Sequence, residues 1–437
     1  MTDNVEVAAS WIPEPTVLRP SKRNRPLLPV DDPFYVDPTD GQQLPAGTLL
    51  RSREVELALL GVVPQKVSAW QLLYRTADLD GRPEVAVTTV LLPAGADPDE
   101  GRPLLAYQCA IDAVSSQSFP SYALQRGSRS PGNIAPVELF IIANAMQRGW
   151  AVSIADHEGI NGYFGAPREP GYRVLDGIRA AQQFAPVGVT ESTPVGVWGY
   201  SGGGMASSWV AEMAPSYAPE IDIVGAVLGA PVGDPGETYI RLNDTFFAGL
   251  PALVVAGLRH IYPGLGRVIE THVNVEGRRR LDEIETMSTA WAIARFARDD
   301  FDNYTDIPLA DVLAMPEVLE LFDDIRLGAE RPSCPLLVVQ PVHDQIIAVE
   351  DVDGQVDRYN DFGADVTYIR DRLSEHLSLM VLSTPTVLDW LTARFAGESA
   401  PPGQTRTVWT TALSASSIRG FAEMGVAALK TVFGRPL

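Results

Sequence analysis

The sequence predicts an α/β fold in which a mostly parallel central sheet is flanked by helices. From about residue 104 onward, strand patterns alternate with helical patterns, which is typical of βαβ units whose helices cover both faces of a sheet. A glycine-rich turn, Gly199–Gly204, links one such strand to the next helix. Between about residues 237 and 331 several helical patterns appear without an obvious strand, and this predicts a helical cap, or lid, inserted between core strands.

The predicted elements follow one another along the chain. Residues 1–45 are rich in Pro and Asp and predict an extended arm over the surface. Strands are expected at 68–79, 84–94, 104–108, 150–156, 194–200, 223–231, 336–342 and 366–371, and helices at 137–149, 171–185 and 205–214. The core therefore falls in two parts, 46–236 and 332–400, which are separated by the cap at 237–331 and followed by a tail, 401–437, with a helical pattern.

Composition narrows the class of protein. The chain has 437 residues, of which 46% are hydrophobic and 20% charged, as in ordinary globular proteins. Its formal net charge of −21 repels nucleic acid phosphates, so no nucleic acid partner is expected, and it also repels anionic membrane surfaces. Cys109 and Cys334 show no metal-binding spacing and are expected to be free and buried.

The sequence shows neither a membrane span nor an export signal. No window approaches 18 uninterrupted apolar residues, so no transmembrane helix is expected. The first 20 residues lack a basic stretch followed by an apolar core, which a signal peptide would have. We expect a soluble protein, and a cytoplasmic location stays open. The sequence carries no indication of oligomeric state.

The turn from Gly199 to Met205, GYSGGGM, suits either a phosphate or a nucleophile. A phosphate loop needs Lys and Ser or Thr where Met205 and Ala206 stand, and a dinucleotide loop needs glycine where Ser201 stands. G-x-S-x-G between a strand and a helix instead matches the nucleophile elbow of α/β-hydrolases. Ser201 is therefore the predicted nucleophile, and the N–H of Gly202, at a helix N-terminus, is a predicted oxyanion donor.

The base and the acid are expected after the later core strands, with the acid first in the chain. His376 follows the last predicted core strand and precedes an apolar helix, where the base is expected. Asp344 comes at the first turn after the preceding strand, which indicates the acid that orients the imidazole. Asp351 and Asp353 are nearby alternatives. The adjacent His343 is expected to make local hydrogen bonds.

The second oxyanion donor is expected in the loop after the strand at 104–108. No H-G-G-G motif is present there, and Asp112 is the candidate polar residue. A bare carboxylate would repel an oxyanion, so Asp112 must either be protonated or contribute only its backbone N–H.

Several motifs together resemble the secretory lipase family typified by yeast lipase A. They are DDPFY (31–35), RSREV (51–55), YRT (74–76), YQ (107–108) with Asp112, DHEG (156–159), LDGIRA (175–180), GYSGG (199–203), SYAPE (216–220), IVGA (223–226), FAGL (247–250), EGRRRL (276–281), HDQIIAVE (343–350) and SEHLS (374–378). The resemblance covers about residues 31–396. It implies an α/β-hydrolase core with a helical cap, a triad of Ser201, Asp344 and His376, and an oxyanion hole of Asp112 and Gly202.

The chain departs from the family in some features. Its two cysteines do not reproduce the disulfide pattern of the yeast members, and the tail after residue 400 does not match closely. That tail suits packing on its own domain, on the cap, on a partner or on lipid. The resemblance implies secretion, although no export signal is seen. In DHEG, the consecutive Asp156, His157 and Glu158 diverge at a strand end, which favours a structural or pocket-lining turn over a metal site.

These observations predict a serine carboxylic ester hydrolase of lipase type that cleaves esters of hydrophobic acyl chains through an acyl-enzyme. The expected partner is a small-molecule or lipid ester, with transient contact at a lipid interface, and no cofactor or metal is expected. Two enzymatic alternatives stay open, acyl transfer by the same triad and short-chain ester hydrolysis. A third alternative is a non-catalytic binding protein on a hydrolase fold.

Overall fold

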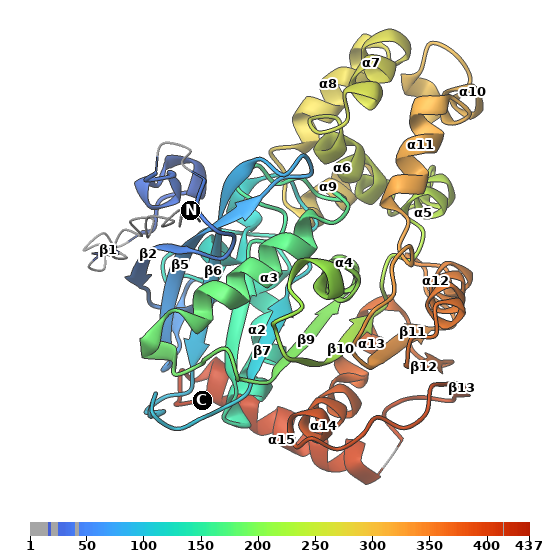
Figure 1. Ribbon diagram of the computed structural model, residues 1–437. Helices are drawn as coiled ribbons and strands as arrows, with labels where there is room; N and C mark the ends of the chain where they lie inside the picture. Colours follow the sequence, from blue (N-terminus) through green and yellow to red (C-terminus); the bar gives the residue numbers. More distant parts are fainter. Residues whose placement is uncertain (1–15, 19–24, 40–42, 414) are drawn as a thin grey trace, which may run out of the picture.

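The computed structural model describes residues 16–18, 25–39, 43–413 and 415–437. One sheet of eleven strands runs through the described molecule (Figure 1) in the order β1-β2-β5-β6-β8-β7-β9-β10-β11-β12-β13. The strands are β1 Thr16–Leu18, β2 Leu49–Glu54, β5 Ser68–Ala77, β6 Pro83–Leu92, β7 Leu104–Gln108, β8 Ala151–Ala155, β9 Val195–Tyr200, β10 Ile223–Gly229, β11 Leu336–Pro341, β12 Val366–Asp371 and β13 Gln404–Val408. A separate hairpin joins β3 (Ala58–Leu59) to β4 (Val63–Pro64).

Apart from the parallel edge pair β1·β2, the sheet changes from antiparallel to parallel along its width. Pairs β2·β5, β5·β6 and β6·β8 are antiparallel, whereas every pair from β8 to β13 is parallel. All five residues of β7 and all six of β9 are buried, as expected of parallel strands covered on both faces. The predicted α/β-hydrolase sheet is confirmed, and it places the carboxyl ends of its parallel strands along one edge.

Helices cover both faces of the sheet. Helices α2 (Ala135–Gln147), α14 (Thr384–Phe395) and α15 (Ala415–Val432) pack together on one face. Helices α3 (Glu169–Gln182), α4 (Gly202–Tyr217) and α12 (Val349–Asp361) pack on the other. Short helices complete this part of the molecule: α1 Pro120–Ala123, α13 His376–Leu382, and the 3₁₀ turns Pro29–Asp31, Pro33–Tyr35, Ser116–Ser118 and Ala185–Val187.

The chain between β10 and β11 is helical and projects beyond the carboxyl edge of the sheet (Figure 1). It contains α5 Pro235–Leu242, α6 Gly249–Leu258, α7 Pro263–His272, α8 Val275–Ile284, α9 Thr289–Arg295, a 3₁₀ turn at Phe301–Tyr304, α10 Leu309–Leu313 and α11 Pro316–Ile325. We call residues 235–325 the helical segment. Arg358 on α12 ties both of its connections to the core, because its guanidinium donates to the carbonyls of Gly233 and Leu327 at 3.0 and 2.8 Å.

The tail after residue 400 contains a strand that the sequence does not predict. β13 pairs with β12 and extends the parallel sheet by one strand at its edge. Four of its five residues are exposed, so β13 lacks the apolar alternation by which strands are recognised. The helical pattern of the tail forms α15. In the described ranges, no helix is both long and apolar enough to cross a bilayer.

Candidate active site

Ser201 occupies the turn between β9 and α4, in a backbone conformation that side-chain-bearing residues rarely adopt, with φ +56° and ψ −121°. Its neighbours must be glycine for steric reasons. A Cβ on Gly199 would overlap the backbone of Gly203, and a Cβ on Gly203 would overlap the carbonyl of Gln108. The sharp turn raises the Ser201 hydroxyl above the carboxyl edge of the sheet, as an elbow requires.

His376 lies 175 residues after Ser201 in the sequence and reaches it from a different loop. It is the first residue of α13, it is 3% exposed, and its Nε2 lies 2.9 Å from Ser201 Oγ. A capping box of Glu375 and Ser378 fixes the start of α13. The hydroxyl of Tyr200 donates to the carbonyl of His376 at 2.6 Å, which ties this loop to the elbow strand.

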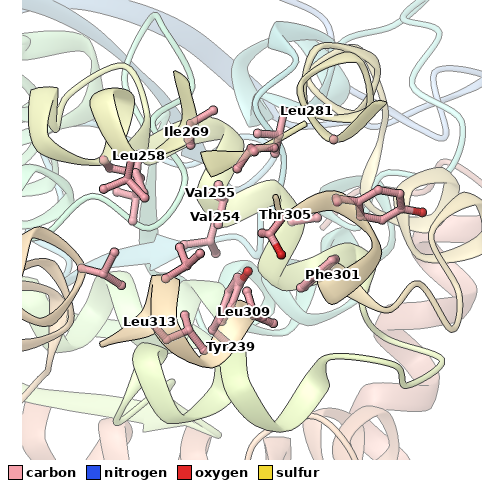
Figure 2. Close-up of a pocket in the computed structure, with 18 of the residues that line it drawn as sticks. Tyr239, Val254, Val255, Leu258, Ile269, Leu281, Phe301, Thr305, Leu309 and Leu313 are labelled. Carbon is pink, nitrogen blue, oxygen red and sulfur yellow. The ribbon is translucent and has the colours of Figure 1, made fainter. Parts of the chain in front are cut away.

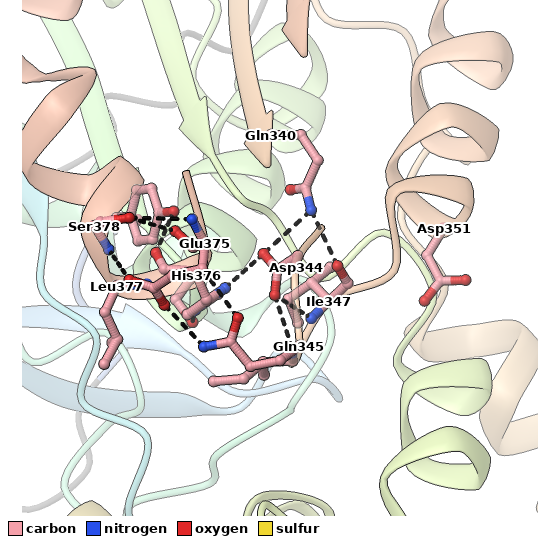
Figure 3. A network of polar contacts seen from close by, with 12 residues as sticks. Gln340, Asp344, Gln345, Ile347, Asp351, Glu375, His376, Leu377 and Ser378 are labelled. Carbon is pink, nitrogen blue, oxygen red and sulfur yellow. Dashed lines mark hydrogen bonds and ion pairs between the residues drawn. The ribbon is translucent and has the colours of Figure 1, made fainter. Parts of the chain in front are cut away.

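Asp344 lies behind His376, with its Oδ2 2.8 Å from Nδ1 of the imidazole (Figure 3). Its other oxygen accepts the backbone N–H groups of Ile346 and Ile347, each at 2.8 Å, and Gln340 Nε2 donates to Oδ2 at 3.2 Å. These donors hold the carboxylate in place, so the Nδ1–H tautomer of His376 is favoured and its Nε2 faces Ser201 as an acceptor.

The alternative acids contact other groups. Asp351 lies on α12, away from His376 (Figure 3), where it faces Arg241 at 4.0 Å. Asp353 accepts from Tyr368 and pairs with Arg370, both at 2.8 Å. The structure therefore brings His376 together with Asp344 and with neither alternative.

Asp112 lies beside Gly202, so closely that a Cβ on Gly202 would overlap Asp112 Oδ1. The role that the sequence predicts for Gly202 is electrostatic only, and the structure adds this steric role. Asp112 has φ +46° and is buried. Burial raises the pKa of its carboxyl to about 7, and the nearby His376 lowers that pKa in part. Below about pH 7 the carboxyl is therefore protonated and able to donate a hydrogen bond.

The backbone N–H of Asp112 donates to Glu158 Oε1 at 3.2 Å. Asp112 has two groups that could donate to an oxyanion, its backbone N–H and its protonated carboxyl. Because the backbone N–H already donates to Glu158, the protonated carboxyl is the group that remains. Burial, and next the Asp112 carboxyl, raise the pKa of Glu158 well above its usual range. The sequence does not by itself predict this contact of Glu158. The available signal was its place after β8, because the carboxyl ends of the parallel strands β7 and β8 meet at one edge.

The three polar side chains of DHEG diverge to separate partners. Asp156 accepts from the backbone N–H of Ser121 at 3.0 Å, and His157 Nε2 lies 2.9 Å from the carbonyl of Cys109. Burial lowers the pKa of His157 to about 4, so its imidazole is neutral. Together with Glu158 they form a buried turn that supports the loop carrying Asp112.

Two adjoining apolar cavities lie above the elbow. The first cavity has a volume of about 60 Å³ and is lined by Ser201, Gly202 and Asp112. Its apolar wall comes from both the core and the helical segment: Phe164, Met205, Val232, Leu242, Leu250, Pro251, Ile346 and Ile347. The second, of about 110 Å³, lies inside the helical segment (Figure 2). Pro235, Tyr239 and Val254 line both cavities, so the two share a wall.

Comparison with known proteins gives the family. The family model described as secretory lipase matches residues 124–403, which include Ser201, Asp344 and His376. The chain belongs to the secretory lipase family. Asp112 lies outside the matched range.

Named relatives agree with this family. A protein of Mycobacterium tuberculosis named "Probable inactive lipase MT1628" is 52% identical over 429 residues, covering 98% of this chain and 96% of its own length. Lipase A of Arthroderma benhamiae is 32% identical over 435 residues, covering 97% and 92%.

A solved structure supports the fold expected of a secretory lipase. Candida antarctica lipase A in its closed state superposes with a TM-score of 0.82 at 25% identity, covering 95% of this chain and 99% of that one.

Proposed function

We propose that this secretory lipase family member is an active serine ester hydrolase that cleaves esters of hydrophobic acyl chains. The observation that carries the proposal is the chain of contacts from Ser201 to His376 to Asp344, at 2.9 and 2.8 Å, beneath an apolar cavity. The relative named as an inactive lipase makes activity the point to test.

The mechanism follows from this geometry. His376 Nε2 takes the proton of Ser201 as Oγ attacks the ester carbonyl, and Asp344 stabilises the imidazolium that forms. The N–H groups of the first turn of a helix lack intrahelical partners, so the N–H of Gly202 can donate to the oxyanion. The protonated carboxyl of Asp112 supplies a second donor. His376 then protonates the leaving alkoxide, and water hydrolyses the acyl-enzyme by the same route.

The helical segment supports the substrate class in this proposal. Helices α5 and α6 contribute Tyr239 and Val254 to the cavity that contains Ser201. We take residues 237–331 as a cap under which the acyl chain extends from Ser201 past these two side chains into the second cavity. Acyl transfer to an alcohol and short-chain ester hydrolysis stay open as alternatives. Secretion belongs to the same proposal, because the family is described as secretory.

The test of activity uses a fluorophosphonate probe and nitrophenyl esters. We expect the intact protein to be labelled and to hydrolyse the esters, and Ser201→Ala to lose labelling and at least about 10⁴-fold in kcat. Ser208→Ala is the matched control, because it removes a buried serine hydroxyl from α4, the helix that Ser201 precedes. The Ser208 hydroxyl donates to the carbonyl of Gly204 and accepts from Gln355, and it makes no hydrogen bond to His376. If the intact protein is not labelled and Ser201→Ala behaves like the parent on the esters, the protein is a non-catalytic binding protein and the proposal is wrong.

A further inference from the structure

Helix α15 presents apolar side chains to solvent. Ile418 is 71% exposed, Leu429 60% and Phe433, just past the helix, 68%. We call Ile418, Ala422, Val426, Leu429 and Phe433 the α15 outer stripe, because their spacing of three or four residues places them along one face. The outward face of a surface helix is ordinarily polar, so a continuous apolar stripe there indicates a contact with something outside the chain.

The opposite face of α15 already anchors the helix to the core. Ala427 and Thr431 are fully buried on that face, and α15 packs against α2 and α14 (Figure 1). Gln65 of the loop after β4 donates to the carbonyl of Thr431 at 3.0 Å. The outer stripe therefore adds nothing to this packing, and its exposure follows from how the inner face is docked.

The charges around the stripe are cationic in a strongly acidic protein. The chain carries a net charge of −21, yet residues 404–437 hold four cationic side chains and one acidic side chain, Glu423. Glu423 is paired at 2.9 Å with Arg419 and at 2.9 Å with Arg148, and Arg148 also lies 3.8 Å from Asp389 on α14, so this cluster of two cations and two carboxylates is neutral. The remaining cations near the stripe, Lys430 and Arg435, have no acidic neighbour on α15 near them in sequence.

The surface continues beyond the N-terminal end of α15. Trp409 is 66% exposed, with the guanidinium of Arg372 5.6 Å from its ring, and Leu413 is exposed too. An amphipathic helix with flanking cations and an exposed Trp is the arrangement that lies in the headgroup region of an anionic bilayer.

We propose that the α15 outer stripe, with Arg419, Lys430 and Arg435, docks on an anionic lipid surface. The net charge of −21 repels such a surface as a whole, so the docking depends on cations and apolar side chains that lie within a Debye length of the lipid. Parallel pairing with a second copy of this chain sets like charges together. Antiparallel pairing about the middle of the stripe brings Arg419 of one copy close to the cationic end of the other, but also Glu423 close to Lys430, so a second copy is an outcome that the test below distinguishes. The proposal does not depend on hydrolase activity.

Vesicle sedimentation tests the docking with the full chain. We expect the protein to bind vesicles of phosphatidylcholine and phosphatidylglycerol mixed in equal parts, not vesicles of phosphatidylcholine alone, and to be released by salt. Replacing Arg419, Lys430 and Arg435 by Gln is expected to weaken binding roughly fivefold for each cation. The double variant Leu429→Glu with Phe433→Glu is expected to weaken it at least about tenfold.

The matched control is Phe362→Glu, which changes a 48% exposed Phe at the end of α12, on the other face of the sheet. It is expected to bind like the parent, and thermal unfolding checks that all variants fold. Failure of the parent to bind the mixed vesicles overturns the proposal, as does binding that survives both sets of substitutions. A dimer in size-exclusion light scattering that the Leu429→Glu and Phe433→Glu variant dissociates assigns the stripe to a second copy instead.

Discussion

At the scale of single residues, the proposed oxyanion site combines a backbone donor with an unusual acid. Asp112 Oδ1 is buried and makes no hydrogen bond to any described protein atom, although buried polar atoms are nearly always paired. The backbone N–H of the same residue is held by Glu158. This division leaves the Asp112 carboxyl to face Gly202 and Ser201, where its protonation state decides whether it donates to an oxyanion or repels one.

The first prediction concerns pH. Because the pKa of Asp112 is raised to about 7, its donor is present below that pH and is lost as pH rises through it. We expect kcat/KM for a soluble nitrophenyl ester to fall above about pH 7. Asp112→Asn keeps an N–H donor at every pH and is expected to flatten this alkaline limb. Asp112→Ala is expected to lose about 10²-fold relative to the parent below pH 7, and less above pH 7, where the parent has itself lost the donor.

Asp156→Asn is the control, because burial also raises the pKa of Asp156 to about 7 but its carboxyl contacts Ser121 rather than the elbow. It is expected to keep the parent's alkaline limb. An alkaline limb that persists in Asp112→Asn would rule out titration of Asp112 as its source.

At the scale of elements, the sheet and the helical segment contribute different things. The sheet edge brings the ends of β7, β9, β11 and β12 together, so loops far apart in sequence meet at Ser201. Gly204 allows α4 to approach this edge closely, since a Cβ there would overlap the carbonyl of Gly229. The helical segment adds a mostly apolar wall to the cavity, which in the proposed function contacts the acyl group, and Thr289 on α9 donates to the carbonyls of Ile111 and Asp112 at 3.2 and 3.1 Å.

The second prediction concerns acyl chain length. Val254 lines both cavities, so Val254→Trp is expected to block the passage between them. Each buried methylene of the acyl chain contributes about 0.8 kcal/mol to binding. If the block leaves two methylenes of a palmitate chain unburied, kcat/KM for the palmitate ester falls by roughly tenfold, while kcat/KM for the acetate ester is unchanged.

Val275→Trp is the control for this series, because Val275 is exposed at the start of α8. An equal loss on all chain lengths would place the damage at the catalytic centre. A parent enzyme with a sharp preference for acetate would be a short-chain esterase.

At the scale of the whole molecule, buried carboxyl groups are a recurring feature. Burial raises the pKa of Glu138 to about 8, of Asp156 and Glu212 to about 7 and of Asp176 to about 6. In the unfolded chain such groups titrate near pH 4. The folded state therefore binds more protons than the unfolded state between about pH 4 and 8.

The third prediction is that stability falls as pH rises. A raised carboxyl pKa gives stability that is complete below about pH 4 and is lost as pH rises through the folded-state value. We expect Tm to be several degrees lower at pH 8 than at pH 5.5, as measured by calorimetry, at roughly 2 °C per kcal/mol. Glu138→Gln removes one of these groups and is expected to reduce the difference. A Tm that increases over this interval contradicts the prediction.

The sequence by itself determined the part of the sheet from β5 to β12 and singled out the candidate residues, but it did not predict the strands β1 and β2. Alternating strand and helix patterns and G-x-S-x-G were enough, because burial on both faces of a parallel sheet and the steric demands of the elbow leave a strong imprint on residue type. Order along the chain then indicated His376 and Asp344. The edge strand β13 left no such imprint, because its side chains face solvent.

Only the tertiary structure decided the contacts made across the fold. Nothing in the local sequence says that Glu158 holds the N–H of Asp112, or that Tyr239 and Val254 stand between two cavities. It also decided which face of α15 is exposed, because both faces of that helix carry apolar residues and only docking on α2 and α14 chooses between them. Long-range packing sets these relations, and residue type alone does not encode them.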